Sequence, residues 1–518
     1  MRIADAIFDE ATKLVRRHQH YAARLEDDVA RVARRTGTRP SKNILFPSYW
    51  SIDRSFDPYY VRSRAETIGY AVVKALNARR YRPQPAISFE VPKEGGGTRV
   101  VSVFPVADNA ISRVVYRQLL AKNSSRLSAR CYAYRRDITL HDAVLDIAAD
   151  LRGRSRLFVA EFDFKKYFDS ISHEHIEQIL LDGRFFVTET ELAVIRAFLR
   201  APTLVPENYQ RTTTDVRLQG IPQGTSISLF LANIAAHPLD RQLERLGVGC
   251  ARFADDTLIW SDDYSSVCRA ANILEAAATA MGVDINVAKS PGVSILTPEG
   301  ASAEFRAKPA IEFLGYKISA SQISIRERSV ARIKEWIAYL VYSNLIEAPK
   351  RGILLSSRIS PKVDRDYVVM IFQLRRYLYG DLTESKLRRF LAKDTPRVQY
   401  RGLMSFYPIL TDERLMRELD GWLLHLVYTS VRYRGRLFRN SGAQALPLPH
   451  GLPKKALISF YGTSSGGALL DLRTPSFVRI AKLVRRAART FGANAVANPL
   501  TLYGTAAVPP TRGYDRII

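Results

Sequence analysis

The stretch 248–261 constrains the fold most, because it places two adjacent carboxylates between two apolar runs. Its β-branched and aromatic residues predict two short strands around a tight turn at Ala254, Asp255 and Asp256. Such a pair is costly to bury, since like charges repel and each desolvated ion costs several kcal/mol. A bound divalent cation would offset that cost. The alternative is a solvated turn, in which Asp is a common residue.

A third carboxylate, Asp163, lies upstream at the end of a predicted strand that begins at Leu157. Ser172 is a suitable N-cap for the helix expected after it. A two-metal site for phosphoryl transfer is usually built from one carboxylate at a strand end and a pair on a hairpin. Mg²⁺ needs only one or two protein carboxylates besides the substrate phosphates. Two ions about 4 Å apart can stabilise the attacking and the leaving oxygen together.

Three segments resemble, in order, the palm motifs of a reverse transcriptase: residues 163–171, 219–228 and 253–256. More narrowly, they resemble the prokaryotic reverse transcriptases of group II introns, retrons and the unknown-group, or defence-associated, enzymes. The resemblance extends from about residue 86 to residue 316 and implies a polymerase with a right-hand fold. The turn departs from the usual Tyr-x-Asp-Asp by one hydroxyl, since Phe253 stands in place of Tyr.

The resemblance assigns the catalytic site to Asp163, Asp255 and Asp256. It implies two Mg²⁺ ions held by these carboxylates, and Mn²⁺ stays open as a substitute. The backbone carbonyl of Phe164 would also face a metal.

The resemblance also assigns six residues to the incoming nucleotide: Lys93, Arg99, Phe168, Gln223, Gly224 and Lys289. The first two flank a glycine-rich hairpin turn, where cations would neutralise triphosphate charge. An ordinary hairpin with solvated charges is the alternative there. The ring of Phe168 would exclude a 2′-hydroxyl and so favour deoxynucleotides, although a core aromatic is the alternative.

Gly224 would let the backbone approach a base pair closely, with Gln223 hydrogen-bonding beside it. Lys289 resembles a lysine near the phosphates that can act as a general acid. A solvated lysine is the alternative reading for Lys289.

Two further segments are candidates for nucleic-acid binding. Arg135 and Arg136 fall in a segment that resembles a template-contacting part of the family. Arg432, Arg434 and Arg436 alternate with aromatic residues, a pattern suited to stacking on single strands. A solvated basic helix end is the alternative for this second group.

The charge of the 518-residue chain supports a polyanionic partner. The formal net charge is +26, and residues 320–518 hold most of the excess. The three cysteines, Cys131, Cys250 and Cys268, lack metal-ligand spacing, which fits a reducing cytoplasm. The sequence shows neither a signal peptide nor an apolar run of about 18 residues, so we expect a cytoplasmic protein without membrane contact.

We therefore expect an α/β (α+β) chain with a right-hand polymerase fold. The predicted parts are an N-terminal helical extension (1–85), fingers and palm (86–316), a helical thumb (317–400) and a basic, mostly helical C-terminal region for nucleic-acid binding or assembly (401–518).

The predicted function is an RNA-directed DNA polymerase with dNTPs as substrates, an RNA template and a DNA product. The appended basic region argues against a minimal retron enzyme, and no Cys/His endonuclease module is visible. A defence-associated enzyme copying a dedicated noncoding RNA is therefore favoured. An intron maturase and a catalytically silent RNA-binding scaffold are the alternatives. The primer, the template and a homo-oligomeric state stay open.

Overall fold

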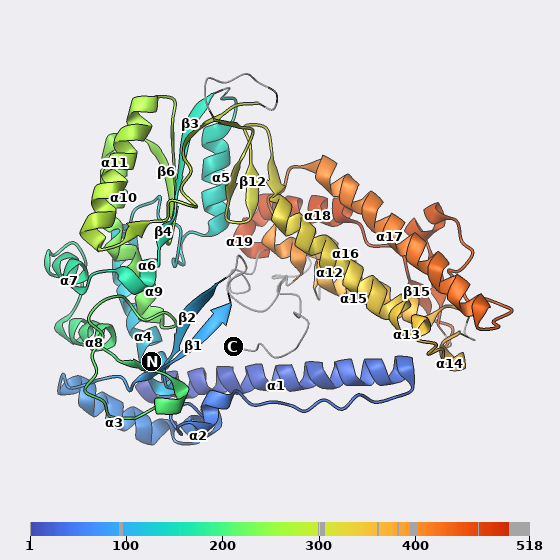
Figure 1. Cartoon of the computed structure of the whole chain (residues 1–518), viewed down its shortest axis with the longest axis horizontal. Helices are drawn as coiled ribbons and strands as arrows, with labels where there is room; N and C mark the ends of the chain where they lie inside the picture. The colour runs from blue at the N-terminus through green and yellow to red at the C-terminus, as the bar shows by residue number, and fades with distance from the viewer. Residues whose placement is uncertain are drawn as a thin grey trace.

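The protein is described by a computed structural model that covers residues 2–92, 97–154, 156–298, 300, 306–359, 362–380, 383–393, 402–464 and 466–496. It is a mixed α/β structure. In Figure 1 a twisted sheet and its helices lie opposite a group of long helices, and the N-terminal helix α1 (Ile3–Thr36) runs along one edge of the molecule.

The N-terminal residues are helical, as their apolar spacing predicts. After α1 come α2 (Pro58–Ser63) and α3 (Ala65–Asn77). Asp57 caps α2 by accepting a hydrogen bond from the Tyr59 backbone N–H at 2.9 Å. Ile7 and Ala11 of α1 are fully buried against α2, α3 and α4 (Val106–Asn123), so α1 is fixed to the rest of the chain at its N-terminal half.

A small sheet precedes the central one. Its hairpin consists of β1 (Ala86–Pro92) and β2 (Thr98–Val103), and β5 (Thr203–Leu204) pairs in parallel with β1. The hairpin was predicted from the two strand-like runs around the glycines, and the pairing of Val91 with Arg99 confirms it.

The central sheet has five strands in the order β10-β9-β3-β7-β6. Their bounds are Leu157–Phe162 for β3, Gly249–Phe253 for β6, Asp256–Ser261 for β7, Gly292–Leu296 for β9 and Ala307–Lys308 for β10. β3 lies between β7 and β9 and is antiparallel to both.

Both faces of this sheet are covered. Phe158 and Ala160 of β3 pack with Val267 of α11 (Tyr264–Met281) on one face. Leu157 and Val159 join the large core on the other face, which includes α5 (Leu140–Leu151). This alternation is the period-two pattern of a strand that is buried on both sides.

Shorter elements surround the sheet. They are α6 (Tyr167–Ser170), α7 (His173–Leu181), α8 (Glu189–Leu199), α9 (Ser226–Ala235), α10 (His237–Leu246) and the strand pair β4 (Phe164–Lys165) and β8 (Asp284–Ile285). Ser172 caps α7 as predicted, because its hydroxyl accepts a hydrogen bond from the His175 backbone N–H at 3.3 Å.

The C-terminal part begins with a three-stranded meander of β11 (Ile311–Phe313), β12 (Tyr316–Ile318) and β13 (Ile323–Ile325). Four long helices follow: α12 (Glu327–Leu345), α15 (Arg365–Tyr379), α17 (Glu413–Asn440) and α18 (Phe477–Phe491). The smaller elements are α13 (Glu347–Lys350), α14 (Ser356–Ile359), α16 (Glu384–Leu391), α19 (Ala493–Val496), β14 (Tyr461–Thr463) and β15 (Leu469–Asp471).

Two of the predicted domain boundaries do not fit this structure. The boundary at 316 falls inside the meander, since Glu312 pairs with Lys317 across it. The boundary at 400 separates helices that share one apolar core, to which α12, α15, α17 and α18 each contribute fully buried residues: Ile337, Leu374, Leu423 and Val484. The described residues after 325 therefore form one helical body, because no separate core supports a second unit there.

The long helices are amphipathic rather than uniformly apolar. α17 buries Leu419, Leu423 and Val427 on one side and exposes Arg432 and Arg436 on another. Within the described ranges, no helix is both long and apolar enough to cross a membrane.

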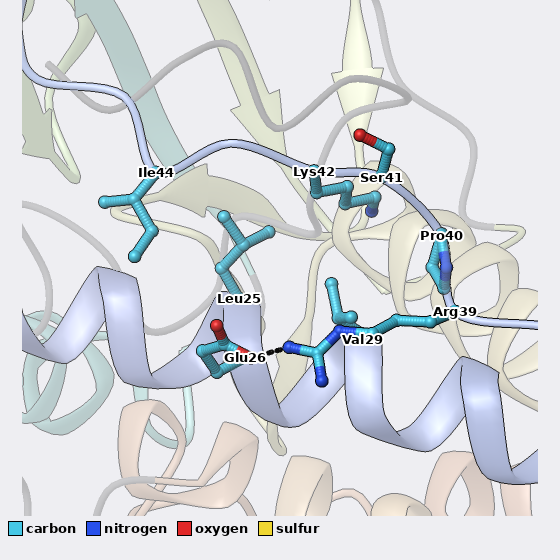
Figure 2. A pocket seen from close by; sticks show the side chains of 8 residues that line it. All are labelled: Leu25, Glu26, Val29, Arg39, Pro40, Ser41, Lys42 and Ile44. Atoms are coloured by element: carbon cyan, nitrogen blue, oxygen red, sulfur yellow. Dashed lines mark hydrogen bonds and ion pairs between the residues drawn. The ribbon is translucent and has the colours of Figure 1, made fainter.

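The far end of α1 touches the helical body through polar groups. Arg35 donates a hydrogen bond to Asn344 Oδ1 of α12 at 3.4 Å. The chain then turns back along α1, where Arg39 pairs with Glu26 at 2.9 Å. A cleft of about 240 Å³ lies between the two segments. Figure 2 shows Leu25 and Val29 of α1 among the side chains that line it. This cleft shares no residue with the carboxylates considered below.

Arg434 is buried inside the helical body, which overturns its predicted role in nucleic-acid binding. It is 1% exposed. Its guanidinium donates to Asp364 at 2.7 Å, to Asp366 at 2.6 Å and to the Leu345 carbonyl at 2.8 Å. The alternating Arg and aromatic residues therefore lie on different faces of α17, and Arg434 lies on the face that packs inside the protein.

The ion pair also explains the state of Asp364. Burial by itself would raise the pKa of Asp364, but the Arg434 guanidinium and His450 hold that pKa at about 2. Since the pKa in the folded protein lies below the usual value of about 4 for an unfolded Asp, the ionised carboxylate stabilises the fold above that pH. This stabilisation is lost as the pH falls through about 2.

We predict that Arg434→Ala lowers the free energy of unfolding by about 3–5 kcal/mol, because two buried carboxylates lose their partner. Arg432→Ala, on the exposed face of the same helix, should change it by less than about 0.5 kcal/mol. Urea denaturation at neutral pH measures both, and the gap between wild type and Arg434→Ala should narrow toward pH 2. Equal effects of the two substitutions would contradict the burial of this ion pair.

Candidate active site

The predicted hairpin is present, and its turn carries the carboxylate pair. Phe253 of β6 pairs with Asp256 of β7, which leaves Ala254 and Asp255 as the two turn residues. Ala254 has a φ of 60°, in the left-handed region that favours glycine. A two-residue turn with a positive φ at its first position matches the twist of the flanking strands. The strained backbone at Ala254 therefore lets the chain reverse direction within two residues.

Asp163 reaches the same place from the neighbouring strand. Phe162, the last residue of β3, pairs with Thr257 of β7, so the next residue, Asp163, follows directly opposite the turn. Asp163 is 7% exposed, and its carboxyl makes a side-chain contact with Asp256. The structure thus brings together the three carboxylates that the sequence singled out.

The closeness of these carboxylates helps to raise the pKa values of Asp255 and Asp256. The pKa of Asp256 is raised to about 7, first by desolvation and then by the negative charges of Asp255 and Asp163. The pKa of Asp255 is raised as well, mainly by desolvation. Like charges crowded at one place gain most from a cation placed among them, and Asp256, which is exposed at the start of β7, is open to one.

Cationic and polar groups already contact Asp163. Lys289 Nζ lies 2.7 Å from Asp163 Oδ2, and this hydrogen bond raises the pKa of Lys289. Asn286 Nδ2 donates to Asp163 Oδ1 at 2.9 Å. Neither Asn286 nor Ser290, whose hydroxyl accepts from the Asp163 backbone N–H at 3.2 Å, was identified from the sequence.

The donor set suits a divalent metal ion. Three carboxylates with unfavourable mutual repulsion supply the hard oxygen ligands that Mg²⁺ prefers. In the part of the chain that is described, no three acidic, His or Cys side chains already stand at mutual distances that would hold an ion. Lys289 supplies the positive charge at Asp163 instead. Phe164 is 2% exposed, with its ring stacked on Tyr167 at 5.4 Å between centroids.

A buried arginine supports the hairpin from behind. Arg252 is 2% exposed and forms a two-pronged ion pair with Asp240 of α10, both contacts being 2.6 Å. The same guanidinium donates to the Ala254 carbonyl at 3.1 Å. Arg252 therefore ties the carboxylate-bearing turn to α10. Arg252 had no predicted role, since its partner cannot be identified from spacing along the sequence.

The loop before α9 lies beside this site, and its glycine makes a close contact within the protein. Gly224 has a φ of 119°, and a Cβ at this position would lie 2.1 Å from the Ser102 carbonyl of β2. The Ser102 N–H donates to the Gln223 carbonyl at 2.7 Å. The close approach that requires glycine is thus to the β1–β2 hairpin, while Gln223 Nε2 donates to Asp169 at 2.9 Å.

Phe168 stays close to the turn. Its ring is partly buried and lies 6.4 Å, edge-on, from that of Tyr134, whose ring is in turn 6.4 Å from Phe253. Its carbonyl accepts a hydrogen bond from Ile221 N–H at 2.7 Å. Phe168 therefore borders the site without being enclosed by it.

The predicted basic residues have different surroundings. Arg99 is exposed on β2, whereas Lys93 lies outside the described residues. Arg136 is exposed, but the side chain of Arg135 is only 6% exposed and donates to the Ser128 carbonyl at 2.7 Å and to Asp137. Arg135 thus stabilises its own loop, which corrects its predicted role in nucleic-acid binding.

Comparison with known proteins agrees with this site. Residues 91–318, a little under half of the chain, match the family model described as reverse transcriptase (RNA-dependent DNA polymerase). The matched segment is similar to a reverse transcriptase domain, and it contains β3, the hairpin of β6 and β7, and the loop before α9.

Curated relatives align with about a third of this chain. A protein named for intron 1 of COX1/OXI3 in Saccharomyces cerevisiae is 27% identical over 169 residues, which is 33% of this chain and 19% of that protein. Protein YkfC of Escherichia coli is 26% identical over 203 residues, 36% of this chain and 48% of YkfC. The chain therefore covers less than half the length of either relative.

Solved structures show a partial likeness. A telomerase from Candida tropicalis, in complex with a fragment of telomeric RNA, aligns with 76% of this chain and 67% of its own, at 13% identity and a TM-score of 0.37. The RNA-dependent RNA polymerase of a human picorbirnavirus aligns with 41% of each chain, at 16% identity and a TM-score of 0.29.

We predict that Gly224→Ala destabilises the protein, because alanine is strained at this φ and its Cβ collides with the Ser102 carbonyl. The backbone conformation alone should cost about 1–3 kcal/mol. Gly421→Ala is the matched control, since a Cβ there meets nothing within 4 Å and the residue lies in α17. Urea denaturation of both variants provides the measurement. A Gly224→Ala protein as stable as wild type would show that this loop does not pack on β2 as described.

Proposed function

We propose that this chain is an RNA-directed DNA polymerase that copies an RNA template into DNA by metal-dependent phosphoryl transfer. The observation that carries the proposal is the meeting of Asp163, from the end of β3, with Asp255 and Asp256 at the tip of the adjacent hairpin. These carboxylates lie within the segment that matches the reverse transcriptase family.

Asp163, Asp255 and Asp256 would hold two Mg²⁺ ions, with Mn²⁺ as a substitute, and Phe164 would contribute its carbonyl. When bound, the ions stabilise charge on the attacking and leaving oxygens. The chain's own part is to keep the carboxylates in place. The tight turn fixes the pair, and Arg252 holds the Ala254 carbonyl from behind.

The residues around the carboxylates support a nucleotide site. Arg99 on β2 and Lys289 beside Asp163 supply positive charge for a triphosphate, and Lys93 would add to it from the same hairpin. Phe168 borders the turn where its ring would exclude a 2′-hydroxyl, which would select dNTPs. Gln223 lies next to this position, held by Asp169.

The template would be held by positive charge on the surface. Arg136, Arg432 and Arg436 are exposed, and the net charge of +26 favours a polyanion along much of the molecule. We propose a dedicated noncoding RNA as template and a role in antiviral defence. Both rest on the resemblance of the palm motifs.

The names of the relatives support a second function. Two of the curated proteins are named for introns in Saccharomyces cerevisiae. An intron maturase, which binds RNA to promote splicing, would use the same basic surfaces. A catalytically silent scaffold is supported less well, since it has no need for a costly cluster of carboxylates.

The test is incorporation of labelled dNTPs, compared with NTPs, by the full chain purified with its native RNA in Mg²⁺. We expect incorporation of dNTPs only, and we expect EDTA to abolish it. Asp255→Asn should reduce the rate at least about 100-fold, the scale on which lost charge stabilisation acts in a transition state.

Asp262→Asn is the matched control, because this carboxylate directly follows β7 and its side chain is 67% exposed. It should leave incorporation unchanged. RNA-bound protein that incorporates neither kind of nucleotide would instead favour the maturase or the scaffold.

A further inference from the structure

The loop of residues 286–290 encloses Asp163 from one side. Asn286 contacts it twice, since its backbone N–H donates to the Asp163 carbonyl at 2.8 Å and its side-chain Nδ2 donates to Oδ1 at 2.9 Å. Ser290 Oγ accepts from the Asp163 backbone N–H at 3.2 Å. Both the backbone and the carboxylate of Asp163 are therefore held by one short loop.

The two carboxylate oxygens of Asp163 have unequal partners. Oδ1 accepts from the side-chain amide of Asn286, a partly buried residue whose backbone is fixed because its backbone carbonyl accepts from the Lys289 backbone N–H at 2.9 Å. Oδ2 accepts from Lys289 Nζ, at the end of a flexible side chain that is 66% exposed. One oxygen thus has a preorganised neutral donor and the other a mobile cation.

This difference has a physical consequence. A neutral amide orients a carboxylate without neutralising it, so the charge stays available to a metal ion. An exposed ammonium on a long stem can move into solvent, and a metal ion that replaced it would compensate the charge of the buried Asp163 carboxylate. The two contacts should therefore have opposite effects on a metal ion at Asp163.

We propose that Asn286 is a positioning residue, which fixes Oδ1 of Asp163 so that Oδ2 faces the metal, and that Lys289 is a removable counter-ion which vacates Oδ2 when the metal binds. The proposal deepens the proposed function and rests on it. It concerns how Asp163 is presented to an ion and assigns no proton transfer to Lys289.

The test is Mn²⁺ binding by the full chain, measured by electron paramagnetic resonance without nucleotide. Asn286→Ala keeps the backbone bond to Asp163 and removes only the side-chain donor. It should weaken Mn²⁺ binding about 10-fold or more, the usual effect of losing a residue that orients a metal ligand. Lys289→Met should instead tighten binding, because the competing cation is gone.

Val287→Ala is the matched control, since this side chain lies in the same loop and is 81% exposed. It should bind Mn²⁺ as wild type does. Asp163→Asn defines the signal that belongs to this site and should remove it.

Two outcomes would overturn the proposal. One is wild-type Mn²⁺ affinity in Asn286→Ala. The other is unchanged or weaker affinity in Lys289→Met, which stays informative even if the Asn286 variant folds poorly, because Lys289 is largely exposed. If either occurs while incorporation of dNTPs still depends on Asp163, the proposed function stands without this inference. If wild type and Asp163→Asn bind Mn²⁺ alike and neither incorporates dNTPs, the proposed function itself fails.

Discussion

The buried ion pair between Arg252 and Asp240 is the contact on which the site depends most. Removing one partner of such a pair typically costs about 3–5 kcal/mol, because the other charge is left without compensation. Arg252 also donates to the Ala254 carbonyl and, more weakly, to the Asn233 carbonyl of α9. Its backbone N–H and carbonyl bond to Arg130 and Tyr132. One residue thus joins the hairpin, two helices and the segment before α5.

The position of that charge also bears on the chemistry. Three carboxylates converge at the end of β3 and the tip of the hairpin, and the pKa values of Asp255 and Asp256 are raised there by desolvation and by neighbouring negative charge. Arg252 lies behind them as a fixed cation, and Lys289 lies beside them as a mobile one. The fixed cation keeps the turn in place, whereas the mobile one leaves room for an ion. The fold therefore leaves an excess of negative charge at the place where a metal ion would bind.

Local pattern in the sequence predicted much of the structure. The strand before Asp163 and the hairpin at 248–261 follow from residue periodicity, which depends only on near neighbours. The convergence of the carboxylates followed from a resemblance, since their separation along the chain holds no geometric information.

The features that the sequence did not predict depend on contacts between residues that are far apart in the chain. The alternation of basic and aromatic residues predicted an exposed Arg434. In the structure its guanidinium is buried against Asp364 and Asp366, about 70 residues earlier in the chain. Nothing in the sequence around Asn286 indicates its role. That role depends on a hydrogen bond to Asp163, which the pairing of β4 with β8 brings close. The boundaries at 316 and 400 failed for the same reason, since one sheet and one apolar core cross them.

The most direct test of the central claim is metal-directed cleavage of the chain. Fe²⁺ replaces Mg²⁺ in the full protein, ascorbate and peroxide generate hydroxyl radicals at the ion, and the fragments are mapped by mass spectrometry. The account predicts cuts near residues 163, 255–256 and 286–290, which excess Mg²⁺ suppresses and Asp163→Asn abolishes. Cuts elsewhere, or cuts that persist in Asp163→Asn, would show that these carboxylates do not hold the metal.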